Sequence, residues 1–345
     1  MDTATLHALV RQFHVESKEA TRVQSGVYRV TTPKGEQFAL KRMKHLDDSH
    51  LRFIDTTLCD VRRAGTHRVR IVWREENKLG GSPAFVRSRE KAYAYVLTPW
   101  IDGRRPDARL PADLVLCAQT LANFHIAFGH LPTNPSFAPP ATYWKLGTWP
   151  KTFRQHTAKM EKRIIEAGQQ TGTLATLLQT QGGALLHEAC EMENALFQSD
   201  YEAMCQSAQD GTTTICHGDC GDKNFVLTTE DAYLIDFETL CVDLPAFDIF
   251  RMIRLQGKAN HFDPDLAMTM LNAYAQVRPL SHEELTLVVI WLRFPMQAAR
   301  ALRSHRVWAD QERAARRLVA AMAQARRMRP LIDRLRAYAQ TMPSG

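Results

Sequence analysis

Short apolar runs dominate the first hundred residues of the chain. Four of them predict strands, over residues 27–31, 37–43, 69–73 and 92–100. Pro33, Lys34 and Gly35 separate the first two runs and are typical of a tight turn. Two segments in this region predict helices. Residues 1–20 predict a short helix, and residues 46–63 predict another because their apolar side chains fall near one face. The pattern therefore predicts a small antiparallel sheet with one inserted helix.

Beyond residue 100 the spacing becomes mostly helical. Residues 111–130 predict a helix whose apolar side carries Leu114, Leu121, Phe124 and Phe128. Residues 131–150 contain five prolines and predict a loop. From residue 150 helical spacing resumes, with predicted breaks at the glycines Gly172, Gly182 and Gly183.

One strand–loop–strand pattern, over residues 212–248, interrupts these helices, and helical spacing continues from residue 245 to the end. We therefore predict an α+β chain with two lobes. Residues 1–98 form the strand-rich lobe and residues 99–345 the larger helical lobe, with a short crossing at residues 97–103. A length of 345 residues fits either two domains or one bilobal unit.

The composition argues against several classes of protein. The longest strongly apolar run spans residues 285–292, far short of the roughly 20 residues that cross a membrane, so we expect no membrane partner. The first ten residues lack a basic and then apolar block, so we expect no secretory signal. The seven cysteines are scattered without paired spacing, which predicts a reducing, cytoplasmic location.

The net charge of +7 is localised. Residues 290–345 contain twelve arginines and three acids, a local charge of +9, which leaves −2 for residues 1–289. Three interpretations remain open: a solvated helix face, a docking surface for an acidic partner such as a coat protein, and a nucleic-acid surface. The third is the weakest, because the segment has no interleaved aromatic platform.

Candidate chemistry is concentrated in residues 215–238. Asp219 and Asn224 lie five positions apart on one predicted loop, and Asp236 follows twelve residues later, after an apolar strand and a turn. A hairpin of that size returns Asp236 to the loop. Carboxylate and amide oxygens are ligands that Mg²⁺ prefers, and transfer of a phosphoryl group from ATP needs them together with an acceptor-binding carboxylate. Two alternatives are a charged surface hairpin and a zinc site from Cys216, His217 and Cys220.

These residues resemble the active site of the aminoglycoside phosphotransferase/choline kinase superfamily, which has a bilobal protein-kinase-like fold. Its pattern H-x-D-x4-N, followed by a strand and I-D-F/W-E/D, matches His217, Asp219, Asn224, Asp236 and Glu238. The resemblance implies that Asp219 is the catalytic base. It implies that Asn224 and Asp236, assisted by Glu238, hold Mg²⁺, and that His217 supports the loop. The implied cofactors are ATP and Mg²⁺, and the implied partner is an unidentified hydroxyl acceptor.

Other segments extend the resemblance along the chain. Lys41, within Phe-Ala-Leu-Lys, resembles the lysine that contacts the ATP phosphates. The segment around Leu97, Thr98 and Pro99 resembles the hinge that packs against adenine. His125, within Leu-Ala-Asn-Phe-His, resembles a buried supporting residue. The D-x-P-x-x-D element of the family matches two further residues with an implied structural role, Asp243 and Asp248.

Within the superfamily, the hinge Trp-Ile-Asp-Gly-Arg and the Trp-Pro segment at residues 149–150 resemble the CotS-like spore coat kinases. That resemblance implies a spore coat location after synthesis in the mother cell. The Trp-Pro segment has the alternative interpretation of local packing.

The sequence departs from the family in two places. The predicted phosphate loop contains a single glycine, so Ser25 and Gly26 are its candidate phosphate contacts. The helix after Lys41 lacks the glutamate that kinases use to hold this lysine. The available acids are Asp47, Asp48, Asp55 and Asp60, and because Asp55 and Asp60 are shorter than glutamate, pairing would need a closer helix. These departures keep a second hypothesis open, in which the chain is a catalytically weak pseudokinase with a structural role in the spore coat.

Overall fold

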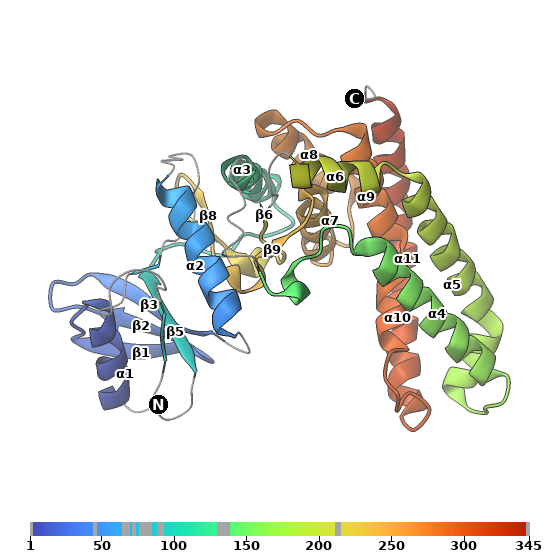
Figure 1. Cartoon of the computed structure of the whole chain (residues 1–345), viewed down its shortest axis with the longest axis horizontal. Coiled ribbons are helices and arrows are strands. Elements are labelled where there is room, and N and C mark those ends of the chain that lie inside the picture. Colours follow the sequence, from blue (N-terminus) through green and yellow to red (C-terminus); the bar gives the residue numbers. More distant parts are fainter. Residues whose placement is uncertain are drawn as a thin grey trace. The chain divides into compact units, whose positions relative to one another are not determined.

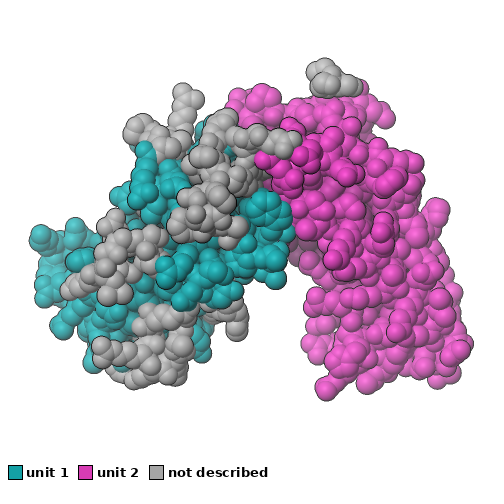
Figure 2. All heavy atoms as spheres, viewed as in Figure 1, with its two compact units in different colours: residues 1–144, 212–242 teal, residues 145–211, 243–345 magenta. Residues whose placement is uncertain are grey.

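The computed structural model of the chain describes residues 3–43, 47–63, 70, 74–75, 85–87, 93–129, 139–210 and 215–342. The chain forms two compact units, shown in different colours in Figure 2. Unit 1 contains residues 1–144 and 212–242, and unit 2 contains residues 145–211 and 243–345. The division of the chain into lobes at residues 1–98 and 99–345 stays a prediction.

Unit 1 begins with an antiparallel sheet of five strands in the order β1-β2-β3-β5-β4. Strands β1, β2, β3 and β5 are labelled in Figure 1. The strands have these bounds: β1 Glu19–Gln24, β2 Val27–Thr31, β3 Gln37–Met43, β4 Val86–Arg87 and β5 Ala94–Pro99. The predicted strands at residues 27–31, 37–43 and 92–100 are therefore confirmed. The predicted strand at residues 69–73 lies almost entirely outside the described residues.

The prediction of a helix over residues 1–20 is wrong in its extent. Helix α1 covers only Thr3–Val10, and a 3₁₀ turn follows over Arg11–Phe13. Strand β1 then begins at Glu19. This edge strand is exposed at nearly every position, so its sequence carries no alternation of apolar and polar residues that could reveal it.

Both faces of this sheet are covered. Alternation along β3 places Leu40 on the face that packs against α1, where it joins a core that includes Phe13 and Leu97. Met43 belongs to a second core with Leu51 of helix α2, which spans Asp48–Arg63 as the spacing of residues 46–63 predicts. Lys41 stands opposite Val96 in the ladder, and Val96 is also part of the second core.

Beyond the sheet, α1 and α2, the described residues of unit 1 form helix α3, two small antiparallel pairs and short 3₁₀ turns. Helix α3 spans Pro111–Phe128, which confirms the helix predicted over residues 111–130. Strand β6 (Ile215–Cys216) pairs with β9 (Cys241–Val242), and β7 (Phe225–Leu227) pairs with β8 (Ala232–Leu234). The strand–loop–strand pattern is therefore also confirmed.

Unit 2 is helical in its described residues. Its helices are α4 Trp149–Ala167, α5 Thr173–Gln198, α6 Tyr201–Asp210, α7 Pro245–Gln256, α8 Pro264–Val277, α9 His282–Arg293, α10 Met296–Ala301 and α11 Gln311–Gln340. The break predicted at Gly182 and Gly183 is wrong, because α5 continues through both. A Cβ atom at Gly182 would lie 2.8 Å from Ile164 of α4, so this glycine permits close helix packing instead of ending the helix.

Trp149 belongs to an aromatic cluster within unit 2. Its ring centre lies 5.4 Å from that of Phe247 and 5.2 Å from that of Trp291. This arrangement favours the local-packing interpretation of the Trp-Pro segment. Among the helices that the structure describes, none combines the length and the apolar character needed to cross a bilayer.

Candidate active site

The β7–β8 hairpin brings Asp236 back to the loop that carries Asn224. Phe225 pairs with Leu234, and the Ile235 N–H then donates a hydrogen bond of 2.9 Å to the Asn224 carbonyl. The turn is closed by the Thr228 N–H, which donates to the Asp231 carbonyl over 2.9 Å. The short spacing between two apolar strands thus determines the local geometry that the sequence predicts.

The side chain of Asp219 is held by its own loop. The Asn224 Nδ2 group donates to the Asp219 carbonyl over 2.7 Å and to Asp219 Oδ2 over 3.0 Å. Lys223 Nζ lies 2.8 Å from the same carboxylate oxygen. Two donors from residues four and five positions later therefore fix the rotamer of Asp219, as an acceptor-binding carboxylate requires.

His217 is fully buried and uses both ring nitrogens. Its Nε2 group lies 2.9 Å from the Ile235 carbonyl, and its Nδ1 atom accepts the Asp219 N–H over 3.3 Å. These partners define a neutral ring that is protonated at Nε2. The ring connects the Asp219 loop to the end of β8. Because both nitrogens are engaged, His217 has no lone pair for the alternative zinc site with Cys216 and Cys220.

Asp236 has a left-handed backbone, with φ 67° and ψ 68°. A non-glycine residue in this region is strained, and such strain concentrates at functional sites. The Lys41 Nζ atom contacts Asp236 Oδ1 and lies 3.0 Å from Glu238 Oε1. The predicted phosphate-binding lysine and two predicted metal ligands therefore meet in one cluster of charged groups.

Two aspartates of α2, Asp55 and Asp60, pair with arginines and not with Lys41. Asp55 forms an ion pair with Arg74, and both side chains are almost completely buried. Asp60 lies 3.6 Å from Arg63 on the helix surface. Within the described residues, Lys41 thus finds its carboxylate partners in the segment after β8 and not in α2. This arrangement accounts for the absence of a glutamate in α2.

His50 is a connection that the sequence analysis missed. His50 is a buried residue of α2, and its Nε2 atom lies 3.0 Å from the carbonyl oxygen of Glu238. Its ring stacks on the ring of Tyr143, with 3.3 Å between the two ring centres. Burial lowers the pKa of His50, so the ring is neutral and Nε2 donates to the carbonyl. A single histidine among apolar helix positions carries no sequence signal for a contact 188 residues away.

A cavity of about 410 Å³ lies beside these groups within unit 1, a volume typical of small-molecule sites. Five of the predicted site residues line it: Lys41, Thr98, Pro99, Asn224 and Asp236. The cavity is also lined by Arg74 and Lys223, neither of which the sequence analysis identified. Its walls thus combine apolar strand residues with cations and oxygen donors, a composition suited to a nucleotide.

Other predicted residues lie beside the cavity without lining it. Ser25 and Gly26 form the two-residue turn between β1 and β2, and Gly26 has a φ of 82° that favours glycine. Leu97 is buried in the core of the α1 face. Asp219 and Glu238 contact the lining residues Asn224 and Lys41, respectively.

The segment after β5 approaches β7 closely. Arg104 and Leu227 exchange two backbone hydrogen bonds, of 2.9 and 2.8 Å. A Cβ atom at Gly103 would lie 2.3 Å from the Leu227 carbonyl, so only glycine fits at this position. The hinge predicted by resemblance is therefore tied to the hairpin that precedes Asp236.

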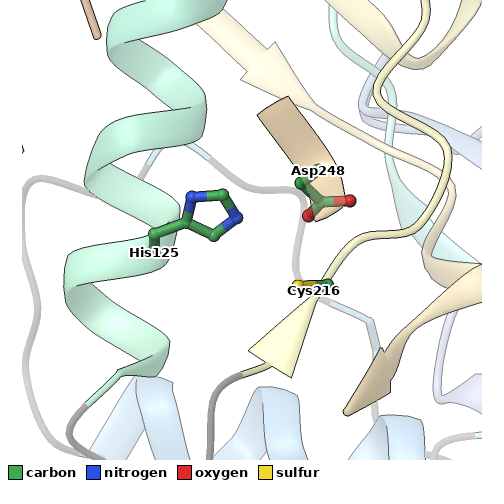
Figure 3. Close-up of side chains that lie close together, drawn as sticks. All are labelled: His125, Cys216 and Asp248. Atoms are coloured by element: carbon green, nitrogen blue, oxygen red, sulfur yellow. The ribbon is translucent and has the colours of Figure 1, made fainter. Parts of the chain in front are cut away.

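The predicted supporting residues are all buried. His125 lies on α3 and Cys216 on β6, with ligand-type atoms within 4.8 Å of each other in unit 1 (Figure 3). In unit 2, Asp243 accepts hydrogen bonds from Trp149 Nε1 over 2.8 Å and from the Leu244 N–H over 2.9 Å. Burial raises the pKa of Asp243 to about 7. Asp248 lies in the first turn of α7.

The oxygen donors of unit 1 fit a divalent cation. The carboxylates of Asp236 and Glu238 already share one cation, the Lys41 ammonium group, which shows that they converge on positive charge. The side chain of Asn224 supplies an amide from the adjacent loop and lines the same cavity as Asp236. Hard oxygen ligands of this kind are the type that Mg²⁺ prefers.

A family model described as the phosphotransferase enzyme family matches residues 19–285, and the chain belongs to this family. An aminoglycoside phosphotransferase from Alicyclobacillus acidocaldarius subsp. acidocaldarius DSM 446 has a similar structure, with a TM-score of 0.78 and 21% identity over 97% of this chain and 96% of that one. A spectinomycin phosphotransferase in complex with ADP and spectinomycin gives a TM-score of 0.57 and 12% identity over 97% and 99%.

An amicoumacin kinase in complex with AMP-PNP and Ca²⁺ gives a TM-score of 0.58 and 13% identity over 100% of this chain and 96% of that one. At these identities the likeness concerns the fold, and it confirms the predicted protein-kinase-like architecture. The family match likewise confirms the resemblance to aminoglycoside phosphotransferases. The CotS-like branch stays a prediction.

Proposed function

We propose that the chain is an ATP- and Mg²⁺-dependent phosphotransferase that acts on a hydroxyl group of a small molecule. One observation carries the proposal: Lys41, Asn224 and Asp236 line a single cavity of unit 1, and Asn224 also holds the carboxylate of Asp219. These are the oxygen donors, the cation and the acceptor-binding carboxylate that phosphoryl transfer needs.

Each group has a distinct role in this proposal. Asn224 and Asp236, with Glu238 beside them, hold Mg²⁺, which neutralises charge on the phosphates when it is bound. Lys41 leaves the two carboxylates and contacts the phosphates. Asp219 accepts the proton of the acceptor hydroxyl and orients its oxygen for attack. The apolar walls near Val96 and Pro99 receive the base.

The names of the similar proteins refer to small-molecule acceptors, which favours a small molecule over a protein acceptor here. The acceptor itself is not defined by the fold. Membership of the CotS-like branch and a coat-protein partner for the arginine-rich helices rest on the residues alone.

The test compares ATP turnover by two loop variants. Asp219→Asn should lower phosphoryl transfer by at least about a hundredfold, because general base catalysis contributes roughly 10²–10⁴-fold. Asp222→Asn removes a carboxylate from the 3₁₀ turn of the same loop and serves as the matched control, with turnover near that of the wild type. ADP release across a panel of hydroxylated metabolites measures both. Equal turnover by Asp219→Asn and the wild type would contradict the proposed role.

A further inference from the structure

Arg254 of α7 is a buried cation in unit 2. Only 7% of its surface is exposed. Within the described residues no hydrogen bond or ion pair is found for it, and its Cζ atom lies 6.0 Å from the centre of the Phe250 ring. Buried charges are normally paired, because removing an ion from water is costly. A bound anion would therefore stabilise the charge of Arg254.

The charged groups around Arg254 make this need greater. Burial, together with the positive charges of Arg251 and Arg300, lowers the pKa of Arg254 to about 10. Burial and the same group of arginines also lower the pKa of Lys258. The pKa of Arg300 is lowered by burial and by the charges of Arg251 and Arg303. The charged neighbours that act on these groups are all cations.

A small cavity opens beside Arg254. Its volume is about 40 Å³, enough for roughly three water molecules and so for one compact oxyanion. Arg254 lines it together with Gln297 of α10 and Trp291 of α9, and Phe250 forms an apolar wall. Among the described residues, Gln297 Nε2 and Trp291 Nε1 are both buried and have no hydrogen-bond partner. Three residues with hydrogen-bond donors therefore line one cavity without an acceptor for these groups.

We propose that this cavity among α7, α10 and α11 binds a phosphate-type oxyanion through Arg254 and Gln297. Arg251, Lys258 and Arg300 add attraction for a multiply charged anion, which favours phosphate over a single carboxylate. The anion is either free inorganic phosphate or the phosphate group of a small ester. The proposal is independent of catalysis, because all of its residues belong to unit 2 and none belongs to the nucleotide cavity.

Thermal unfolding of the full chain, in millimolar inorganic phosphate at constant ionic strength set with KCl, tests the proposal. A ligand that binds only the folded state raises Tm, and we expect a rise of roughly 2 °C or more at saturation. Arg254→Met should abolish the rise. Without phosphate, this variant should unfold at the same or a higher temperature than the wild type, because it removes an uncompensated buried charge. Arg317→Met, an exposed arginine of α11, should keep the full rise.

Two further variants keep the result decisive. Gln297→Leu should reduce the rise even if Arg254→Met does not fold. Lys41→Met should keep the rise, since phosphate bound in the nucleotide cavity would depend on Lys41. A larger rise with glycerol 3-phosphate identifies an ester as the ligand, and an equal one identifies the free ion. No rise in the wild type, a rise retained by Arg254→Met and Gln297→Leu, or its loss in Lys41→Met would overturn the proposal.

Discussion

Lys41 Nζ contacts Asp236 Oδ1 and lies 3.0 Å from Glu238 Oε1, so one ammonium group joins two carboxylates that we assign to the metal. In the proposed function these two carboxylates would hold Mg²⁺, so Lys41 and the metal would compete for them. Lys41 would then contact the phosphates of the nucleotide. In the structure, the ion pairs reduce the repulsion between the two like-charged carboxylates.

Removing the Lys41 ammonium group should strengthen the binding of Mg²⁺ alone. Ion pairs at this partial exposure contribute at most about 1 kcal/mol each, so Lys41→Met should bind Mg²⁺ roughly three- to tenfold more tightly than the wild type. ATP turnover should fall at the same time. Calorimetric titration with Mg²⁺ measures the first effect. Lys34→Met, in the exposed β2–β3 turn, is the control, and unchanged affinity in Lys41→Met would contradict direct competition.

The Asp55–Arg74 ion pair should be a major contributor to the stability of unit 1. Arg74→Met removes the cation that faces a completely buried carboxylate, and breaking a buried pair in this way costs about 3–5 kcal/mol. The double variant Asp55→Leu/Arg74→Met should recover most of that loss, because no charge remains buried. Urea unfolding gives the three free energies. A loss below about 1 kcal/mol in Arg74→Met would show that the pair is not a buried interaction in solution.

His50 should act as a positioning residue for the Glu238 segment. His50→Phe keeps an aromatic ring for stacking on Tyr143 but loses the donor to the Glu238 carbonyl, at a cost of about 1 kcal/mol in stability. We expect weaker Mg–ATP binding in this variant and recovery of binding in His50→Gln, whose amide can donate. Calorimetry with Mg–ATP compares the two. Equal affinities in His50→Phe and the wild type would limit His50 to packing.

Asp243 should make stability depend on pH. Its pKa is about 7 in the folded chain and about 4 when unfolded, so between these pH values only the folded state keeps the proton. The free energy of unfolding should therefore fall as pH rises through this window, by up to about 1.4 kcal/mol per pH unit, and become level above pH 7.

Urea unfolding of the wild type and Asp243→Asn across this range isolates that contribution, because asparagine does not titrate. The difference between the two proteins should change with pH only in the window below about 7. Asp265→Asn, at an exposed position of α8, controls for the general effect of losing a carboxylate. A difference that is constant from acid to neutral pH would contradict a raised pKa at Asp243.

The sequence identifies the candidate site residues better than the long-range contacts that hold them in position. Asp219, Asn224 and Asp236 fall within one short hairpin, where local spacing alone brings them together. Lys41 could be identified because alternation along β3 determines its face of the sheet. The exposed strand β1 was missed, because it lacks an apolar face.

The supporting contacts could not be predicted because they join distant segments. His50 meets Glu238 across 188 residues, and a lone histidine on a helix does not specify its partner. The same holds for Asp55, whose pairing with Arg74 depends on how the chain returns to α2. From the sequence alone, the absence of a glutamate in α2 suggests that no carboxylate holds Lys41 in place. In the structure, Lys41 pairs instead with the carboxylates of Asp236 and Glu238.

Calorimetric titration of the wild-type chain with Mg–ATP tests the central claim most directly. Saturable binding at or below millimolar nucleotide is the predicted result, with affinity at least about tenfold lower in Asp236→Asn, because that variant loses a charged metal ligand. ATP without Mg²⁺ should bind more weakly than Mg–ATP. Failure of millimolar Mg–ATP to bind the folded chain would contradict the account and favour the pseudokinase hypothesis.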